Sequence, residues 1–267
     1  MFGTPAGKCP TTGWRFALTE FPHTISRRLS PDELEQALHA VGAERYHVLH
    51  PFHKMMNAGE LTKQQMQAWA LNRYCYQAVI PKKDAIILSR SDDPAFRCEW
   101  RKRIVDHDGE QGSEGGIERW LRLAEGLGLS RADVMSRRLA LPATRFAVAA
   151  YVDLVSSSSL LVAVASSLTE LFSGIAISER VPAMLERYDY INEGTLAYFK
   201  PRLHQAPRDA EHALSLVQEW ADTMEKQQAA IDALITKCDI LWAQLDALHH
   251  AYVSPGHIPP AAFRPEG

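Results

Sequence analysis

The chain of 267 residues has 46% hydrophobic residues and a formal net charge of -3. Its length and apolar content allow one large buried core, and the negative balance argues against a nucleic-acid-binding protein, which usually carries a concentrated basic excess. The sequence begins without the apolar run of a secretory signal, and no run approaches the ~20 apolar residues that span a bilayer. We therefore predict a soluble, cytoplasmic protein that binds neither nucleic acid nor a membrane. Four scattered cysteines without a C-x-x-C pair predict reduced thiols.

The first predicted helix begins after a segment without clear periodicity. Residues 1–28 form that segment, and we expect a loosely ordered N-terminal extension there. At residue 30 the signals change, because Ser30 can cap a helix, Pro31 fits its first turn and Glu33 completes a capping box. A helix is therefore predicted from this point.

The second strong helix signal covers residues 62–81. Thr62 and Gln65 repeat the capping box, and Pro81 supplies a stop. Further helices are expected over 93–109, 115–130, 130–139, 143–172, 208–221 and 223–253, with the fourth of these a helical pair or a single bent helix.

The last predicted helix has the clearest apolar stripe. Eight side chains recur at intervals of three and four residues, the pattern of a buried helix: Ile231, Leu234, Ile235, Cys238, Leu241, Trp242, Leu245 and Leu248. Convincing period-2 alternation is absent from the sequence. We therefore predict an all-α fold, a compact bundle of about seven to eight helices. One domain is expected over 29–253, followed by a proline-rich tail over 254–267.

Three predicted helices each place two polar side chains four residues apart, on one face. The pairs are Arg73 with Gln77, Arg103 with His107, and Tyr198 with Arg202. An arginine in a helix is usually solvated, but Arg73 lies in "WALNRYCYQAVIP", which is mostly apolar or aromatic. A cation in such surroundings needs an anion, and a ligand carboxylate is the natural partner if the protein supplies none.

Three histidines stand three residues apart in "RYHVLHPFHKMM", at His47, His50 and His53. Pro51 predicts that one helix ends near His50 and another begins after it, so the three imidazoles are not expected to share a face. The stretch alone therefore does not identify a shared site.

A metal site stays open as an alternative. Glu44 with His47, and Asp209 with His212, have the spacing of helices in di-iron carboxylate proteins, although such pairs also arise by chance in a chain with 11 histidines. The acidic stretch "VDHDGEQGSEGG" lacks the ligand spacing of a calcium loop, and we interpret it as a helix end followed by a glycine-rich loop.

Four long stretches carry a resemblance to a known family: "YHVLHPFHKMMNAGELTKQQMQAWALNRYCYQAVIPKKDAII", "RIVDHDGEQGSEGGIERWLRLAEGLGLSR", "SSLTELF" and "KCDILWAQLDALHHAY". Over residues 29–252 the chain resembles the pyrroloquinoline-quinone synthase family, within the heme-oxygenase-like and thiaminase-II-like superfamily. The resemblance implies a heme-oxygenase-like fold, a homodimer, and an oxidase that uses neither a cofactor nor a metal.

The resemblance also implies a reaction. Such an enzyme completes pyrroloquinoline quinone by ring closure and an overall eight-electron oxidation with dioxygen, and it releases hydrogen peroxide. The implied substrate is a quinone-related tricarboxylic bicycle with an amino-acid side arm. Because a reduced quinol-like substrate can itself pass electrons to dioxygen, the protein needs to hold it, move protons and stabilise negative charge on oxygen.

Twelve positions correspond to the site of that family. The resemblance assigns catalysis to His47, His107, Tyr198 and Arg202. It assigns substrate binding to Tyr46, Arg73, Gln77, Arg103, Tyr151, Glu170, Arg180 and Lys237. Carboxylate binding would fall chiefly to Arg73, Gln77, Arg180 and Lys237, proton transfer to the two histidines, and the oxygen pocket to Tyr198 and Arg202. His50 and His53 are expected to be structural.

We further expect the site arginines to line a dry cavity in which only the substrate supplies their counter-ions.

Two positions depart from the pattern expected of the family or of a regular helix. Ile177 stands where many family members have an active-site histidine, and an isoleucine cannot transfer protons. Either His107, His47 or Tyr198 therefore takes over that proton transfer, or catalysis is altered. Pro201 precedes Arg202, which predicts a kink or a helix start nearby. The serine run 156–159 has no explanation in the sequence.

Three alternative functions remain. A thiamin-salvage hydrolase of the same superfamily relies on a nucleophilic cysteine, and the comparable stretch "AVASSLTE" has none. A di-iron oxidase would use Glu44, His47, Asp209 and His212. A non-catalytic carrier of the finished quinone would need the same arginine-rich pocket, and the isoleucine at 177 favours it.

Overall fold

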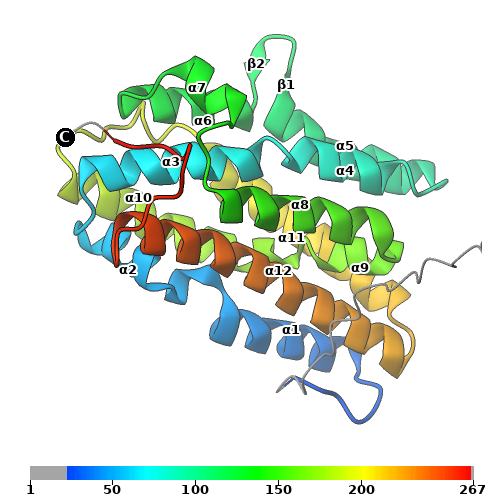
Figure 1. The fold of residues 1–267 in the computed structure, drawn as a ribbon. Helices are drawn as coiled ribbons and strands as arrows, with labels where there is room; N and C mark the ends of the chain where they lie inside the picture. The colour runs from blue at the N-terminus through cyan, green and yellow to red at the C-terminus, as the bar shows by residue number, and fades with distance from the viewer. Residues whose placement is uncertain (1–22, 266–267) are drawn as a thin grey trace, which may run out of the picture.

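The computed structural model describes residues 23–265. Most of the predicted N-terminal extension, residues 1–22, and the last two residues of the predicted tail lie outside the described residues. The described chain folds into a bundle of helices, and α12 crosses its middle with α8 on one side and α1 on the other (Figure 1). The predicted all-α class is confirmed, but the described residues form more helices than the seven to eight predicted.

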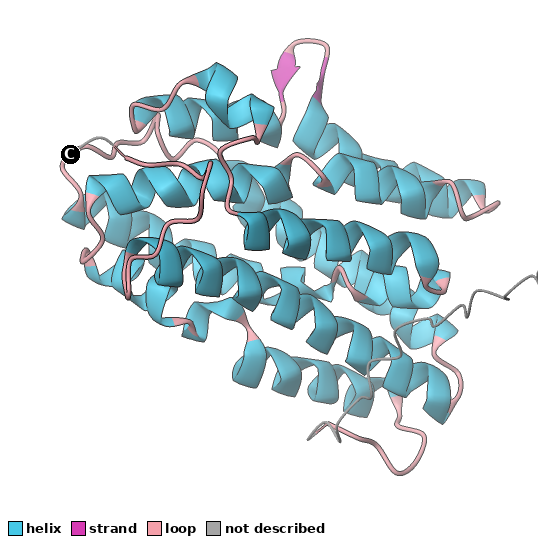
Figure 2. Ribbon diagram, viewed as in Figure 1, coloured by secondary structure: helices cyan, strands magenta, loops and turns pink. Residues whose placement is uncertain are grey.

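The helices follow one another along the chain with short connections. They are α1 (Pro31–Arg45), α2 (Pro51–Ala58), α3 (Lys63–Gln77), α4 (Ile80–Leu88), α5 (Pro94–Asp108), α6 (Gly116–Gly126), α7 (Arg131–Ser136), α8 (Pro142–Ser157), α9 (Leu160–Ala165), α10 (Ser173–Arg187), α11 (Phe199–Trp220) and α12 (Met224–Tyr252). Two short 3-10 helices are η1 (His47–Leu49) and η2 (Leu168–Phe172). Two strands of two residues, β1 (Gly109–Glu110) and β2 (Ser113–Glu114), form an antiparallel hairpin (Figure 2).

Both predicted capping boxes are present. The Ser30 hydroxyl accepts a hydrogen bond from the Glu33 amide, and the Glu33 side chain accepts one from the Ser30 amide. Thr62 and Gln65 make the same pair of bonds at the start of α3. Each box satisfies amides that would otherwise lack partners at a helix start, which explains why these two starts could be placed from the sequence.

Helices predicted as single elements are divided at identifiable residues. The segment 62–81 becomes α3 and α4, because Pro81 lies in the first turn of α4 instead of ending α3. The serine run separates α8 from α9, and the Ser159 hydroxyl caps α9 by accepting from the Val162 amide. Pro201 lies in the first turn of α11, where a missing amide hydrogen is tolerated, so the predicted helix start is confirmed.

The described end of the N-terminal segment is attached to α12. The Ile25 amide donates to the Gln228 side chain at 2.9 Å, and the Leu29 amide donates to the Gln227 side chain at 2.7 Å. Gln227 also donates to the Leu29 carbonyl. These contacts lead the chain into α1 beside α12.

The region over residues 160–187 is more apolar than the sequence analysis recognised. By length and composition alone it matches a membrane span, with a mean hydropathy of 1.9 in its most apolar window. The fold divides the region into α9, η2 and α10, and 56% of that window is buried inside the bundle. This burial is typical of core helices in a globular protein.

Helices α1 and η2 approach each other closely at Gly42 and Phe172. A Cβ atom on Gly42 would lie 2.1 Å from the Phe172 Cζ atom, so only glycine fits there without movement. The Phe172 ring packs against Tyr46, with ring centroids 5.3 Å apart. Gly42 therefore helps to position the residue that follows α1.

Candidate active site

A cavity inside the bundle brings together most of the predicted site residues. Its volume is about 90 Å³. Nine of the twelve predicted residues line it: Tyr46, His47, Arg73, Gln77, His107, Glu170, Arg180, Tyr198 and Arg202. The other three, Arg103, Tyr151 and Lys237, are buried directly behind the wall. The predicted residues thus converge although they come from elements spread over most of the chain.

Two cations in the cavity wall have no acidic partner among residues 23–265. The Arg73 guanidinium lies over the Tyr76 ring, 4.2 Å from its centroid. Arg180 contacts the His53 Nδ1 atom at 3.0 Å and the face of Phe199, and its buried Nε atom has no hydrogen-bond partner in the described part of the chain. Burial, together with the nearby Arg73, lowers the pKa of Arg180 to about 10. An anionic ligand would supply the missing counter-charge.

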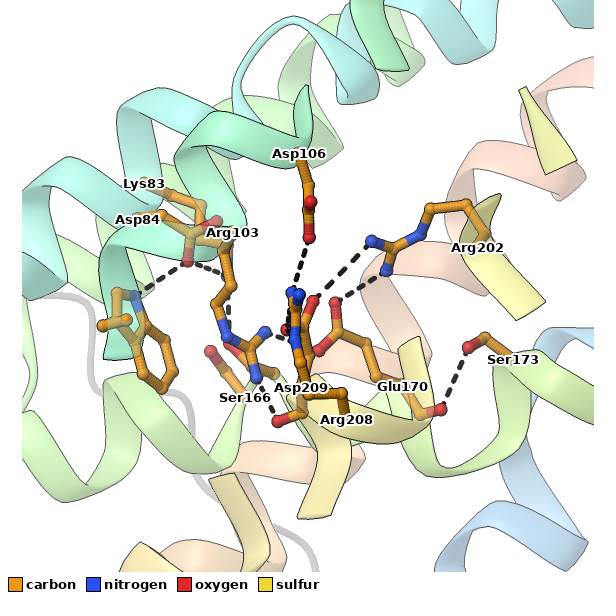
Figure 3. A network of polar contacts seen from close by, with 12 residues as sticks. Lys83, Asp84, Arg103, Asp106, Ser166, Glu170, Ser173, Arg202, Arg208 and Asp209 are labelled. Atoms are coloured by element: carbon orange, nitrogen blue, oxygen red, sulfur yellow. Dashed lines mark hydrogen bonds and ion pairs between the residues drawn. The ribbon is translucent and has the colours of Figure 1, made fainter. Parts of the chain in front are cut away.

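Glu170 lines the cavity and is held by two arginines (Figure 3). Its carboxylate accepts from Arg103 at 2.5 Å and from Arg202 at 3.2 Å. Arg103 also donates to the Asp209 carbonyl, and the Asp209 carboxylate lies 3.7 Å from Arg202. Burial alone would raise the pKa of Glu170, but the two arginines lower it to about 2. Glu170 is therefore ionised at neutral pH.

The network extends outward through a third arginine. Arg208 contacts Asp209 at 2.6 Å and Asp106 at 2.5 Å. Three arginines thus face three carboxylates. The expectation that substrate alone neutralises the site arginines is wrong for Arg103 and Arg202, because residues distant in sequence supply their counter-ions. For Arg73 and Arg180, which have no acidic partner among the described residues, it stays a prediction.

His107 has a defined tautomer. Its Nδ1 atom lies 2.9 Å from the Arg103 carbonyl, which can only accept, so Nδ1 carries the proton. The Nε2 atom is buried and has no partner among the described residues. Burial, together with the positive charge of Arg202, lowers the pKa of His107 to about 3. The ring is therefore neutral, and its free Nε2 lone pair can accept a proton from a bound molecule.

His47 and His53 come closer together than the sequence suggested. Their ring centroids are 5.6 Å apart, and both line a small cavity of about 20 Å³ beside Arg180. His47 stacks on Tyr46 at 4.3 Å, and its buried Nδ1 atom has no partner among the described residues. Burial and the two cavity arginines hold the pKa of His47 well below its usual range. His47 is thus a second neutral imidazole that faces the cavity.

His50 lies outside the cavity and has a structural role, as predicted. Its Nδ1 atom accepts from the Phe52 amide and caps α2. Its other ring nitrogen lies 3.0 Å from the Asp246 carboxylate on α12. Both ring nitrogens are therefore used in holding α2 against α12.

Tyr198 and Gln77 are joined across the cavity. The Tyr198 hydroxyl donates to the Gln77 side-chain oxygen at 3.0 Å. The Tyr198 ring meets the Trp120 ring edge to face, with centroids 4.9 Å apart. Tyr198 and Arg202 are one helical turn apart and both face the cavity, which confirms the shared face inferred from their spacing.

Tyr76 is a cavity residue that the sequence analysis missed. Its hydroxyl lies 2.5 Å from the Lys237 Nζ atom, and its ring stacks on Tyr151. Tyr76 follows Arg73 by three residues, so the helical period could have indicated it. Other lining residues, among them Trp120, Thr169 and Ser173, are common residue types whose sequence context gives no comparable signal.

Ile177 lines the cavity on α10 and is 6% exposed. An isoleucine there presents methyl groups to the cavity and cannot transfer a proton. Two imidazole nitrogens in the cavity wall, His107 Nε2 and His47 Nδ1, have no hydrogen-bond partner among the described residues and can take part in proton transfer.

The four residues considered as di-iron ligands do not form one cluster. Glu44 pairs with His23 at 2.8 Å, while Asp209 is engaged by Arg202 and Arg208. His212 lies against the Phe96 and Trp100 rings. Within residues 23–265, no group of three or more histidine, cysteine, aspartate or glutamate side chains is arranged to hold one metal ion.

A larger depression of about 920 Å³ lies on the outside of the molecule, and its lining includes Arg137, Arg138 and Arg145. These arginines are exposed, in contrast to the cavity residues. Exposed arginines are solvated by water, so the buried cavity is the better candidate for an active site.

The family assignment rests on the sequence match. The TENA/THI-4/PQQC family description matches residues 35–247, which include all twelve predicted site residues and the whole cavity wall. The chain belongs to this family. Relatives in the family include a pyrroloquinoline-quinone synthase of Acidiphilium cryptum, 66% identical over 239 residues that cover 90% of this chain and 97% of the relative. A protein of the same name from Granulibacter bethesdensis is 61% identical over 241 residues, covering 90% of this chain and 94% of that relative.

Solved structures show the same fold at low sequence identity. A TenA homologue from Pseudomonas syringae superposes with a TM-score of 0.67 at 15% identity, over 85% of this chain and 99% of that chain. A domain with a heme oxygenase-like fold from Shewanella denitrificans also gives a TM-score of 0.67 at 15% identity, over 87% and 96% of the two chains. The heme-oxygenase-like fold of this family member is thereby confirmed.

Proposed function

We propose that this chain is a pyrroloquinoline-quinone synthase, the oxidase that completes pyrroloquinoline quinone from a reduced tricarboxylic precursor. The reaction closes a ring, removes eight electrons in total and transfers them to dioxygen, with release of hydrogen peroxide. The names of relatives 61–66% identical over 90% of the chain support this assignment.

The observation that carries the proposal is the unbalanced charge of the cavity. Arg73 and Arg180 line it without an acidic partner among the described residues, beside two neutral histidines. Arginine forks bind carboxylates through two parallel hydrogen bonds, which gives orientation as well as attraction. A polyanionic substrate with protons to lose fits such a site.

We assign carboxylate binding to Arg73, Arg180 and Gln77. His107 would accept a proton from the substrate at Nε2, because its Nδ1 proton is fixed by the Arg103 carbonyl. His47 would take part in a second proton transfer, since it lines the cavity and its Nδ1 atom has no partner among the described residues.

Tyr198 and Arg202 would form the oxygen pocket. A phenol hydroxyl and a guanidinium can donate hydrogen bonds to a peroxide-like anion as negative charge develops on it. Arg202 is held in place by Glu170, so it is oriented before substrate binds. Pre-oriented donors lower the barrier because they need little reorganisation during the reaction.

The test is a single-turnover experiment with the reduced precursor under air. A synthase yields the absorption spectrum of the finished quinone, with consumption of dioxygen and appearance of peroxide. A carrier, which the apolar residue at 177 favours, binds the precursor but leaves its spectrum unchanged, and that result would overturn the proposal. His107→Asn removes the free nitrogen at Nε2, so it should slow the conversion while the precursor still binds.

The metal requirement is tested separately. Protein purified from iron-supplemented cells should convert the precursor without stoichiometric iron, measured by elemental analysis. Iron at one or two equivalents that is needed for turnover would favour the di-iron alternative. We further propose that the enzyme is a homodimer that works in the cytoplasm, which sedimentation and cell fractionation can check.

A further inference from the structure

Lys237 occupies an unusual place for a lysine. It lies in the middle of α12 and is 0% exposed. Its Nζ atom lies 2.5 Å from the Tyr76 hydroxyl oxygen and 3.5 Å from the centroid of the Tyr151 ring. No carboxylate among residues 23–265 lies within ion-pair distance of this nitrogen. An ammonium group in such surroundings is strongly disfavoured unless an anion arrives nearby.

The charged groups around Lys237 explain its state. Arg73 approaches from α3 and Lys83 from α4, and both oppose a further positive charge. Glu170 on η2 and Cys238 on α12 favour one, but two arginines already neutralise Glu170. Burial is the largest effect and holds the pKa of Lys237 well below its usual range. Tyr76 and Tyr151 complete the enclosure, and burial raises the pKa of both phenols.

The cavity has one unpaired positive charge fewer than the proposed substrate has carboxylates. The ion pairs of Glu170, Asp209 and Asp106 with three arginines are internally neutral. Lys83 is paired with Asp84 at 2.6 Å. Among the cavity residues that the structure describes, two unpaired cations therefore remain, Arg73 and Arg180, whereas the proposed substrate brings three carboxylates.

We infer that Lys237 is the third cation: a neutral amine in the empty enzyme that binds one proton when a tricarboxylate enters the cavity. The proton comes from solvent and ends on the Nζ lone pair. Tyr76 lies between the amine and the cavity, so its hydroxyl can pass a proton to Nζ while it accepts another from a cavity water. The phenol is unchanged afterwards, and the net change is one proton on Lys237. This inference rests on the proposed function, because it requires a tricarboxylate ligand.

The experiment measures proton uptake during binding of pyrroloquinoline quinone itself. Isothermal titration calorimetry at pH 8 in buffers of different ionisation enthalpy gives the number of protons taken up per site. We expect about one proton for the unmodified protein, and an affinity that falls about tenfold per pH unit where uptake is complete. Lys237→Met should abolish the uptake and flatten this pH dependence. Lys63→Met, which changes an exposed lysine at the start of α3, should leave both unchanged.

Three outcomes separate the possibilities. Binding without buffer dependence in the unmodified protein overturns the inference and leaves the proposed function standing. Uptake that persists in Lys237→Met assigns the proton to another group, with His47 and His107 the nearest candidates, and also overturns it. Absence of any binding removes the proposed function and the inference together.

A second measurement avoids substitution of a buried residue. In protein labelled with 15N at lysine side chains, the Lys237 Nζ signal should have the chemical shift of a free amine without ligand. With pyrroloquinoline quinone bound, it should move to the ammonium range. A signal in the ammonium range before the ligand is added would overturn the inference, whatever the variant does.

Discussion

Glu170→Gln is the most informative single test of the charge network. Glu170 accepts hydrogen bonds from Arg103 and Arg202, and these arginines are only 2% and 7% exposed. Glutamine has nearly the same shape but no charge. The substitution therefore removes the anion and leaves two guanidinium groups inside the bundle with less compensation.

The expected loss follows from the contacts. Two charge-assisted hydrogen bonds contribute about 1.5–3 kcal/mol each, which gives about 3–6 kcal/mol together. Loss of one partner of a buried ion pair costs about 3–5 kcal/mol in measured cases. Glutamine can still accept at one oxygen, and a neutral side chain is easier to bury, so we expect the free energy of unfolding to fall by about 3 kcal/mol.

The loss should depend on pH in one direction. Arg103 and Arg202 lower the pKa of Glu170 from its ordinary 4.5 to about 2. The stabilisation from the ionised carboxylate is therefore fully present above pH 4.5 and is lost as the pH falls towards 2. The difference between the unmodified protein and the variant should be largest at pH 7 and should shrink at pH 3.

Urea unfolding followed by circular dichroism at both pH values measures this difference. Glu99→Gln is the matched control, because Glu99 pairs with Lys102 on the surface and both side chains are at least one third exposed. That control should change stability by less than about 1 kcal/mol. A Glu170→Gln variant that unfolds within about 1 kcal/mol of the unmodified protein at pH 7 would refute the reasoning, as would a loss of equal size at pH 3.

Three further predictions concern the cavity. Because folding lowers the pKa of His107 from 6.5 to about 3, the unfolded chain binds more protons than the folded protein below pH 6.5. The free energy of unfolding should therefore fall by about 2 kcal/mol from this group between pH 7.5 and 5. In urea titrations, His107→Asn should lose that part of the pH dependence. Gly42→Ala forces the Phe172 ring to move and should cost about 1–3 kcal/mol in thermal unfolding, with partial recovery when Phe172→Leu is added; a fully stable single variant would contradict the close packing. Arg202→Ser should slow oxidation in single-turnover kinetics more than it weakens precursor binding, and equal effects on both would defeat the oxygen-pocket assignment.

The parts of the fold that could be predicted depend on neighbouring residues. Capping boxes at Ser30 and Thr62 act within one helical turn, so the sequence contains all the groups involved. The division into α3 and α4 was missed because a proline ends one helix or begins another with the same local chemistry. Only the packing of α4 against α5 and α8 selects the second possibility at Pro81.

In the site, too, local contacts could be predicted from the sequence, whereas contacts between distant residues could not. Arg73 with Gln77, and Tyr198 with Arg202, share faces because their spacing matches the helical turn. The pairing of Glu170 with Arg103 joins residues 67 positions apart, and no local pattern indicates it. The family resemblance named these residues as a set, but it did not indicate that Arg103 and Lys237 would lie behind the wall.

The division between paired and unpaired cations has a consequence for binding. Arg202 is held by Glu170 and Asp209 whether or not substrate is present, so its position does not depend on the ligand. Arg73 and Arg180 repel each other across the empty cavity, and this repulsion contributes to the lowered pKa of Arg180. Ligand carboxylates that enter the cavity relieve this repulsion. Part of the binding free energy therefore comes from the electrostatic repulsion between the two arginines in the unliganded protein. The same ligand should therefore raise the unfolding temperature more than its contact area alone would suggest. The oxygen-pocket arginine contributes little to this gain, since its counter-ions are already in place.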